Sequence, residues 1–499
     1  MADQNLSDLR ESIRALVADI VEKDAAGATV SGAGPGPGTS SGAGSAPGDP
    51  AGGMPVAQGT GIHPTIDIAV TAAKQAFTAL GTQGLKERRA YIAAMKEAAL
   101  RNGALLARMA AEETGMGNPT DKHAKNMVAA EETPGVEDLQ SEAFTNEHGL
   151  ALVERAPYGV IGAITPSTNP TATIISNSIG MIAAGNAVVF NPHPAAKACS
   201  AKTVTILNDA IVAAGGPPNL LTTIASPTIE SANRLMDHPS VAIMVVTGGP
   251  GVVKAAMQRT KKVIAAGPGN PPCVVDETAH IDKAGRDIVN GGGFDHNIVC
   301  ICEKEVLVVE SVADALIESM GRHGAFFMSA EQTALVTNMV IKEPGAPGKE
   351  GAANKQFVGK SPAFIAGAAG FSVPDGTKLL ACVVPADHAL VWTEQLMPVM
   401  PVVRLPNVDA CIDLAVECEH GFRHTAIMHS LNVEKLSEMA RRMNCSLFVK
   451  NGPCYAGLAR GGAGFTSFTI ASPTGEGLTR ARTFTRERRC TLVDYFRIV

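Results

Sequence analysis

The sequence predicts an α/β protein with two doubly wound domains, preceded by an amphipathic helix on a tether. Short apolar runs alternate with helical patterns in two successive series, which is typical of parallel sheets covered by helices. A stretch rich in Gly, Ala and Pro, residues 25–60, separates residues 1–24 from the remainder. The 499 residues are 45% hydrophobic and 18% charged, enough to bury the cores of two or three domains.

The composition excludes several classes of protein. A net charge of -6 without a long Lys/Arg run argues against a general nucleic-acid or anionic-membrane surface. Ten cysteines without a repeated spacing do not resemble a disulfide framework or a zinc ribbon, so we expect a reducing compartment and no metal. No apolar run reaches the length of a membrane span, and the N-terminus lacks the features of a signal peptide. Small-molecule chemistry is favoured.

Residues 1–24 are predicted to form an amphipathic helix that binds a partner. Its apolar residues recur at spacings of three and four, with charged residues between them. A helix of this kind usually packs on its own protein, but residues 25–60 have too few large apolar groups to fold. As a random coil this tether of about 36 residues spans roughly 33 Å. Because so short a helix is marginal in water, it needs a groove or bundle elsewhere.

Residues 61–273 are predicted to form the first α/β domain. Thr65 and Gly81 are placed to cap and stop a helix whose apolar stripe runs from Ile66 to Leu80, and residues 85–114 continue as one or two helices. Strands are then expected at 160–165, 187–191, 221–225 and 241–247, with helices at 171–184, 195–214, 228–237 and 252–259. Ligands of such a sheet bind at the carboxyl ends of its strands.

Residues 274–480 are predicted to form the second α/β domain, with a cleft between the two. Strands are expected at 306–309, 379–384, 424–431 and 446–449, with helices at 312–323 and 433–443. Beyond them, residues 481–499 contain a strand-like run.

The stretch from residue 291 to 305 is the first candidate for catalysis. A glycine-rich approach leads to Cys300 and Cys302 beside charged residues. Glycines let a backbone come close to a ligand, and a thiol among donors and cations can ionise. A cysteine in an apolar segment is more often buried and inert, so these residues alone leave both cysteines open.

Three other segments carry possible chemistry. Gly248 and Gly249 join a strand to a helix, where a phosphate can approach the helix N-terminus, although such turns are common and no dinucleotide fingerprint or P-loop is matched. Asn169, between two prolines, is either a turn residue or a donor to an oxyanion. Glu394 is either a solvated charge or a site carboxylate, and His424, like His296, is expected to be structural.

Taken in order, these segments resemble the aldehyde dehydrogenase superfamily from about Ile62 to the C-terminus. The finer resemblance is to its CoA-acylating branch associated with bacterial microcompartments, the propionaldehyde dehydrogenases and their acetaldehyde relatives. The segments that carry it are ITPSTNP at 164–170, AGNAVV at 184–189, NPHP at 191–194, TGG at 247–249, GNPP at 269–272, FDHNIVC at 294–300 followed by EKE at 303–305, Glu394, and FTSFTIASPTGEGLTRAR at 465–482.

The resemblance implies a set of site residues. Cys300, which follows Phe-Asp-x-Asn-x-x, becomes the nucleophile, and Cys302 is non-catalytic. Asn169 and the Cys300 main-chain N–H form the oxyanion hole, and Glu394 holds the nicotinamide ribose. Coenzyme A is the co-substrate and no metal is required. The residues implied to bind NAD, with NADP as an alternative, are Thr165, Pro166, Asn191, Pro192, His193, Thr247, Gly248, Gly249 and Val253.

One departure from the superfamily pattern favours acyl transfer over hydrolysis. Hydrolytic members carry a glutamate in Leu-Glu-Leu-Gly-Gly that activates water, whereas residues 264–269 here read IAAGPG, without a carboxylate. An acyl thioester on Cys300 would then persist until a second thiol attacks, because a thiolate needs less base assistance than water. Asn191 and Pro194 also replace the Lys and Glu that grip the adenosine ribose, which removes a repulsion against the 3′-phosphate of CoA.

The expected reaction is therefore oxidation of a short-chain aldehyde to its CoA thioester, with propionaldehyde favoured and NAD reduced to NADH. An acetaldehyde-specific acylating enzyme and a hydrolytic or semialdehyde dehydrogenase are the alternatives, and a non-catalytic shell-interaction protein is disfavoured by the number of site motifs. The resemblance also implies that residues 1–24 direct the enzyme to a shell protein in the microcompartment lumen. Residues 140–156 and 481–499 would form an oligomerisation arm, the latter extending a neighbouring subunit's sheet, in a dimer or tetramer.

Overall fold

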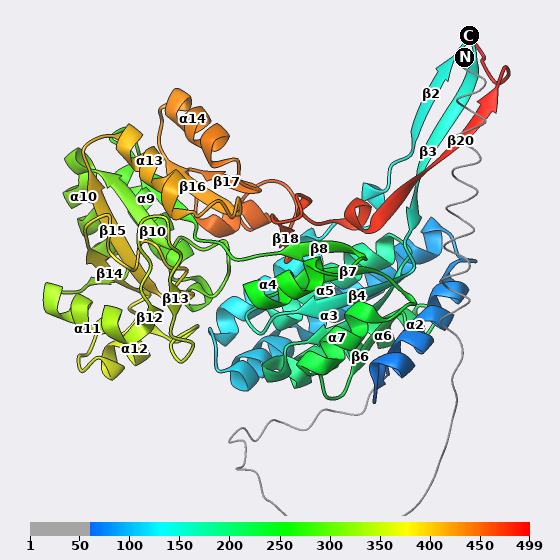
Figure 1. Ribbon diagram of the computed structural model, residues 1–499, viewed down its shortest axis with the longest axis horizontal. Helices are drawn as coiled ribbons and strands as arrows, with labels where there is room; N and C mark the ends of the chain where they lie inside the picture. Colours follow the sequence, from blue (N-terminus) through cyan, green and yellow to red (C-terminus); the bar gives the residue numbers. More distant parts are fainter. Residues whose placement is uncertain (1–59) are drawn as a thin grey trace, which may run out of the picture. The chain divides into compact units, whose positions relative to one another are not determined.

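The computed structural model describes residues 60–499, which all fall within one compact unit (Figure 1). The predicted helix at 1–24 and the linker as far as residue 59 lie outside the described residues. Among residues 60–499, no helix combines the length and apolarity needed to cross a bilayer.

The first sheet has six parallel strands in the order β1-β6-β5-β4-β7-β8. The chain runs outward from β4 through β5 and β6, then crosses back to β7, so the strand order reverses between β4 and β7. Ligands of doubly wound sheets bind at such a reversal. The strands are β1 (Ile62–His63), β4 (Val160–Thr165), β5 (Ala187–Pro192), β6 (Leu221–Ile224), β7 (Val241–Thr247) and β8 (Lys262–Ala266).

The helices of this part of the chain pack around the sheet, and α5 is the central one. Every residue of α5 is buried, including its polar residues Thr171, Thr173, Ser176, Asn177 and Ser178. The helices are α2 (Ile66–Leu80), α3 (Leu85–Thr114), α4 (Pro119–Glu132), α5 (Pro170–Ala183), α6 (Lys197–Ala213), α7 (Ile229–Asp237) and α8 (Pro250–Met257).

The second sheet has seven parallel strands in the order β11-β14-β15-β10-β9-β16-β17. The strands are β9 (Pro272–Val275), β10 (Glu305–Val309), β11 (Ala325–Phe327), β14 (Leu379–Val383), β15 (Val399–Leu405), β16 (Thr425–His429) and β17 (Leu447–Lys450). The helices are α9 (Ile281–Gly292), α10 (Glu310–Arg322), α11 (Ala330–Val340), α12 (Pro362–Ala368), α13 (Val408–Cys418) and α14 (Val433–Met443). Small ladders pair β12 (Ile341–Glu343) with β13 (Ala352–Ala353) and β18 (Ile470–Ala471) with β19 (Gly477–Leu478).

A third sheet is antiparallel and joins distant parts of the sequence. It consists of β2 (Glu142–Asn146), β3 (Gly149–Pro157) and β20 (Thr485–Val493) (Figure 1). The sequence placed residues 481–499 against a neighbouring subunit, whereas β20 pairs with β3 of its own chain along its full length. The pairing of β20 within its own chain does not require a second subunit, so oligomer formation through this arm stays a prediction.

The expected pattern of parallel strands and helices is present, and the α/β class is confirmed. The element ends differ from the expected ones by a few residues, as for the helix expected at 252–259, which runs as α8 from Pro250 to Met257. The chain leaves the first sheet after β8 and enters the second at β9, so the change falls at residues 267–271. The expected boundary at 273 lies just beyond it, inside β9.

Candidate active site

A cavity of about 600 Å³ lies where the two sheets meet. Its walls come from the carboxyl ends of β4 and β7, the turn after β8, the segment around Cys300, and Glu394. The structure brings together all of the predicted site residues except Val253. Those that line the cavity are Thr165, Pro166, Asn169, Asn191, Pro192, His193, Thr247, Gly248, Gly249, Cys300 and Glu394.

Val253 points elsewhere. Its side chain is buried in the core beneath α8, and the preceding Val252 lines the cavity instead. Successive residues of a helix are rotated by about 100°, so a prediction that is one residue off changes the face on which a side chain lies.

The turn that carries the nucleophile has an unusual backbone. Asp295, His296 and Asn297 have φ angles of 47°, 54° and 60°, three left-handed residues in succession without a glycine. Such conformations are unfavourable for L-residues and persist where surrounding contacts hold them. The Asn297 side chain supplies two of these contacts by donating to the carbonyls of Gly292 and Glu303, both at 2.8 Å.

A buried ammonium group closes this turn. Lys304 is fully buried, and its Nζ donates to the carbonyls of Asn297 at 3.0 Å and Val299 at 3.3 Å and also contacts Asn297 Oδ1. Among residues 60–499, no carboxylate lies within ion-pairing distance of it. Its positive charge is therefore not cancelled by a direct partner, and it acts on the thiol of Cys300, four residues earlier in the chain.

Of the two candidate thiols, only Cys300 reaches the cavity. Cys302 is fully buried, with its Sγ 3.9 Å from the carbonyl of Phe294. Burial raises the pKa of Cys300 to about 12, the Glu394 charge adds to the increase, and the Lys304 charge opposes it. The thiol of the ligand-free protein is therefore protonated at neutral pH, and its reactivity depends on these two charges.

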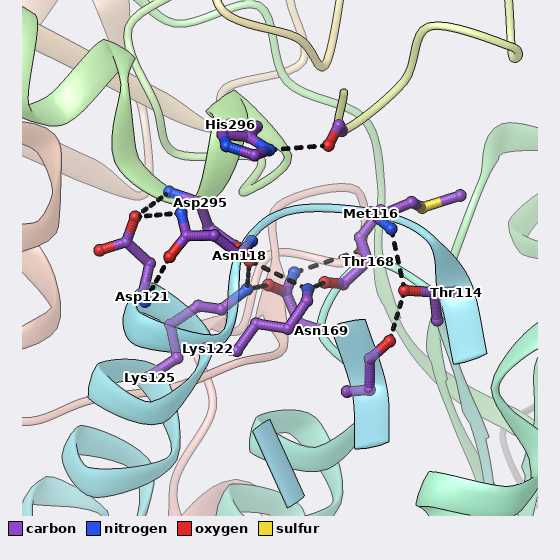
Figure 2. Close-up of polar contacts among 12 residues, drawn as sticks. Thr114, Met116, Asn118, Asp121, Lys122, Lys125, Thr168, Asn169, Asp295 and His296 are labelled. Carbon is purple, nitrogen blue, oxygen red and sulfur yellow. Dashed lines mark hydrogen bonds and ion pairs between the residues drawn. The ribbon is translucent and has the colours of Figure 1, made fainter. Parts of the chain in front are cut away.

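Two N–H donors are free to face a substrate oxygen. The main-chain N–H of Cys300 has no acceptor among residues 60–499. Asn169 is the N-cap residue of α5, and its amide contacts Thr168 Oγ1 at 3.3 Å through Nδ2 and Lys125 Nζ at 2.6 Å through Oδ1 (Figure 2). Preorganised donors of this type stabilise the alkoxide that forms when a thiolate adds to a carbonyl.

The reversal point of the first sheet offers a cradle for a phosphate group. Gly249 is the N-cap residue of α8, and no side chain caps this helix. A Cβ atom added at Gly249 would meet nothing within 4 Å among the described residues, so the backbone is open to a ligand. Free N–H groups at a helix N-terminus favour an anion, so this end of the cavity fits a dinucleotide pyrophosphate.

The Aldehyde dehydrogenase family matches residues 48–334. The chain belongs to this family. The acetylating acetaldehyde dehydrogenase EutE of Salmonella typhimurium is 51% identical over 443 residues, which cover 88% of this chain and 94% of that relative. The resemblance found in the sequence is thereby confirmed.

Solved structures of this aldehyde dehydrogenase family superpose closely. A propionaldehyde dehydrogenase of Rhodopseudomonas palustris, with bound CoA and an acylated cysteine, has a TM-score of 0.84 at 47% identity and covers 87% of this chain and 98% of its own. A propionaldehyde dehydrogenase from the Clostridium phytofermentans fucose utilisation bacterial microcompartment has a TM-score of 0.85 at 43% identity, covering 88% and 100%.

The cavity of this aldehyde dehydrogenase has one carboxylate among its described lining residues, Glu394. Its Oε1 accepts a bond from the Gly269 N–H at 3.3 Å, and burial raises its pKa to about 7. Ala266, Gly267 and Pro268, within the segment compared above with Leu-Glu-Leu-Gly-Gly, form part of the cavity wall. That wall carries no acid or base.

The sequence pattern did not place two further residues, Lys355 and His424, near the site. Lys355 is the only ammonium group among the described residues that line the cavity, and together with burial its charge lowers the pKa of the neighbouring His193. His424, expected to be structural, is fully buried against Gly269 beside the Cys300 segment. Its Nε2 has no partner among the described residues, and burial lowers its pKa to about 4, so it is neutral. Neither residue belongs to a recognisable motif, and its position near the cavity depends on how segments far apart in the sequence pack together.

The described residues contain no group of three or more His, Cys, Asp or Glu side chains arranged to hold a metal ion.

Proposed function

We propose that the protein oxidises a short-chain aldehyde to the corresponding acyl-CoA and reduces NAD to NADH. The observation that carries this proposal is the pairing of a cavity-facing thiol, with two free oxyanion donors, and a cavity wall at residues 266–268 without a carboxylate. The names of the relatives support it, because they describe an acetylating dehydrogenase and a propionaldehyde dehydrogenase holding CoA and an acylated cysteine.

The first half of the reaction requires the Cys300 thiolate. Lys304 favours the thiolate electrostatically, and Glu394, with a pKa of about 7, disfavours it when ionised. The thiolate adds to the aldehyde carbon, and the resulting alkoxide accepts bonds from Asn169 Nδ2 and the Cys300 N–H. NAD, when bound, accepts the hydride that leaves this carbon. The product on the protein is a Cys300 acyl thioester.

The second half transfers the acyl group to sulfur. With no general base on the 266–268 wall, water near the thioester stays a poor nucleophile. The thiol of CoA loses its proton much more readily than water, so its thiolate attacks the acyl carbon and Cys300 leaves. The same cavity must first release NADH if CoA uses the adenosine end of the dinucleotide site.

The cofactor residues stay as assigned from the sequence, apart from Val253. Gly248 and Gly249 would receive the pyrophosphate, and Glu394 the nicotinamide ribose. Asn191 offers no carboxylate near a ribose phosphate, and Lys355 supplies a positive charge to the cavity, beside a His193 whose pKa is lowered by burial and by that charge. These groups favour a phosphorylated ligand, CoA or NADP as well as NAD.

The aldehyde is proposed to be propionaldehyde, with acetaldehyde as the alternative. Large apolar side chains line part of the cavity that Cys300 enters, namely Met116, Ile301, Leu458 and Phe468. Initial rates with acetaldehyde, propanal and longer aldehydes, each with NAD or NADP at saturating CoA, decide between the two.

We further propose that residues 1–24 bind a microcompartment shell protein, so that the enzyme acts in the microcompartment lumen as a homo-oligomer, dimer or tetramer. A structural relative from a fucose utilisation microcompartment supports the location. The exposed edge residues Leu492 and Val493 on β20 support a contact between subunits.

The test of the reaction compares Cys300→Ala with Cys302→Ala. NADH formation from propanal is followed with and without CoA. We expect Cys300→Ala to lose turnover and Cys302→Ala, which removes a buried sulfur that does not line the cavity, to keep most of it. The opposite result contradicts the choice of nucleophile, and equal rates of acid and acyl-CoA formation contradict the argument from the missing carboxylate.

A further inference from the structure

A buried ammonium group lies behind the proposed oxyanion donor. Lys125 is on the face of α4 that packs against α5, and its side chain is 4% exposed. Its Nζ donates to Asn169 Oδ1 at 2.6 Å and also binds the carboxylate of Asp295 (Figure 2). Among the described residues, Asn169 lines the cavity and Lys125 does not. Any effect of Lys125 on a substrate must therefore pass through Asn169 or through the field of its charge.

The orientation of the Asn169 amide determines whether it stabilises or destabilises the negatively charged substrate oxygen. With Nδ2 toward the substrate, it donates to the alkoxide; turned by 180°, it would present an oxygen to a negative charge. An ammonium group only donates, so Lys125 can face only Oδ1. Nδ2 then points the other way, and its single contact, to Thr168 Oγ1 at 3.3 Å, leaves one hydrogen for a ligand.

We propose that Lys125 is a positioning residue that locks the Asn169 amide with Nδ2 toward the oxyanion. The inference rests on the proposed role of Asn169 and deepens it. The charge of Lys125 also polarises the amide, since a cation bound to Oδ1 makes the Nδ2 hydrogens stronger donors.

The contacts of Lys125 also align Asn169 with the nucleophile. Asp295 is fully buried in the left-handed turn that leads to Cys300, and its other oxygen accepts the Asn118 N–H at 2.8 Å. Thr171 in the first turn of α5 donates to Asn126 of α4 at 2.7 Å, which ties the two helices together. Lys125 therefore joins the side-chain donor of the oxyanion hole to the segment that supplies its main-chain donor.

Lys122 is a matched control. It is equally buried, at 2% exposed, and donates to the same Asp295 oxygen at 3.1 Å and to the Thr168 carbonyl at 3.4 Å. It makes no bond to Asn169 among the described residues. Lys122→Met and Lys125→Met each remove a buried ammonium group from α4. Only Lys125→Met also removes the hydrogen bond to Asn169 Oδ1.

The experiment is a double-mutant cycle on the rate of the first NADH turnover, measured by stopped flow with saturating NAD and propanal. Asn169→Ala is expected to slow this turnover by about 100-fold to 1000-fold, as for an oxyanion donor. Lys125→Met is expected to slow it by about 10-fold or more with little change in KM for the aldehyde. In the Asn169→Ala background, Lys125→Met should add less than about twofold, because the amide it orients is gone. Lys122→Met should slow the first NADH turnover by the same factor in the wild-type enzyme and in Asn169→Ala.

Two results overturn different claims. If Lys125→Met slows the Asn169→Ala enzyme by the same factor as the wild type, Lys125 does not act through the amide and the inference fails. If Asn169→Ala keeps the wild-type rate, the oxyanion role of Asn169 fails. Lys125→Gln, which retains an N–H donor without the charge, should recover part of the lost rate. If circular dichroism and thermal melting show that Lys125→Met does not fold, Lys125→Gln replaces it in the same double-mutant cycle.

Discussion

At the scale of single residues, two charges of opposite sign control the Cys300 thiol. The Glu394 carboxylate raises its pKa and the Lys304 ammonium lowers it, against a larger increase from burial. The two residues form no hydrogen bond or ion pair with each other among the described residues, but their charges interact, because Lys304 also lowers the pKa of Glu394 against the increase from burial. Both charges should affect the rate at which the Cys300 thiol of the ligand-free enzyme reacts with an alkylating reagent.

Glu394→Gln should make the ligand-free thiol more reactive. Glu394 ionises as the pH rises through about 7, so its negative charge opposes thiolate formation above that pH. Removing the charge lowers the pKa of Cys300, and iodoacetamide should inactivate the variant faster, with the profile of rate against pH shifted to lower pH. NAD-dependent turnover should fall, since the proposed ribose ligand is lost. Slower alkylation would instead identify Glu394 as the proton acceptor of the thiol.

Lys304→Met should have the opposite effect on alkylation. Loss of the cation raises the pKa of Cys300, so the same profile should move to higher pH. Lys304→Gln is the companion variant, because it keeps a donor for the Asn297 and Val299 carbonyls without the charge. Equal shifts in the two variants indicate charge; a shift confined to Lys304→Met would show that the turn geometry matters more.

At the scale of elements, the N-terminus of α4 is fastened to the catalytic turn. Gly117 precedes Asn118, the N-cap residue of α4, and has a φ of 68°. A Cβ at Gly117 would lie 1.9 Å from Asp295 Oδ1, closer than any real contact. Only glycine therefore permits the close approach through which Asp295 reaches the Asn118 N–H, Lys122 and Lys125.

Gly117→Ala should be costly in both stability and rate. Gly370 is the control, since its φ of 87° is similarly left-handed but nothing lies within 4 Å of an added Cβ among the described residues. We expect Gly370→Ala to cost about 1 kcal/mol from backbone strain alone. Gly117→Ala adds overpacking of about 1–3 kcal/mol and should slow the first NADH turnover. Equal melting temperatures for the two variants would contradict this account.

At the scale of the whole molecule, every described site residue lies between Met116 and Ile470. Removing residues 1–59 should therefore leave kcat/KM for propanal and CoA unchanged within about twofold. The truncated enzyme should no longer sediment with intact microcompartments when produced beside them, because the proposed shell contact is lost. The full-length enzyme is the control; loss of activity on truncation would mean that the N-terminal residues contribute to the catalytic fold.

Much of this architecture could be predicted from local patterns. The described elements that the sequence predicted, and the glycine turn before α8, have the expected type, because each is encoded in consecutive residues. The second series was incomplete, since four of the seven strands of its sheet and two of its six helices were predicted, and β9, β15, α9 and α13 are among those missed. Val253 shows the limit of this reasoning, because a helical position one residue away lies on another face. The pairing of β20 with β3 joins residues more than 300 apart, which no local pattern specifies.

Short sequence segments were sufficient to identify the family, the nucleophile motif around Cys300 and the absence of a carboxylate at residues 264–269. Each of these features consists of a few consecutive residues, so it can be recognised without knowledge of the tertiary structure. Tertiary structure alone decided that Cys300 rather than Cys302 faces the cavity, that Lys304 lies beneath the turn, and that Lys125 bonds Asn169. Each of these depends on the distance and burial of residues from separate elements, and electrostatic and hydrogen-bond energies are set by those two quantities.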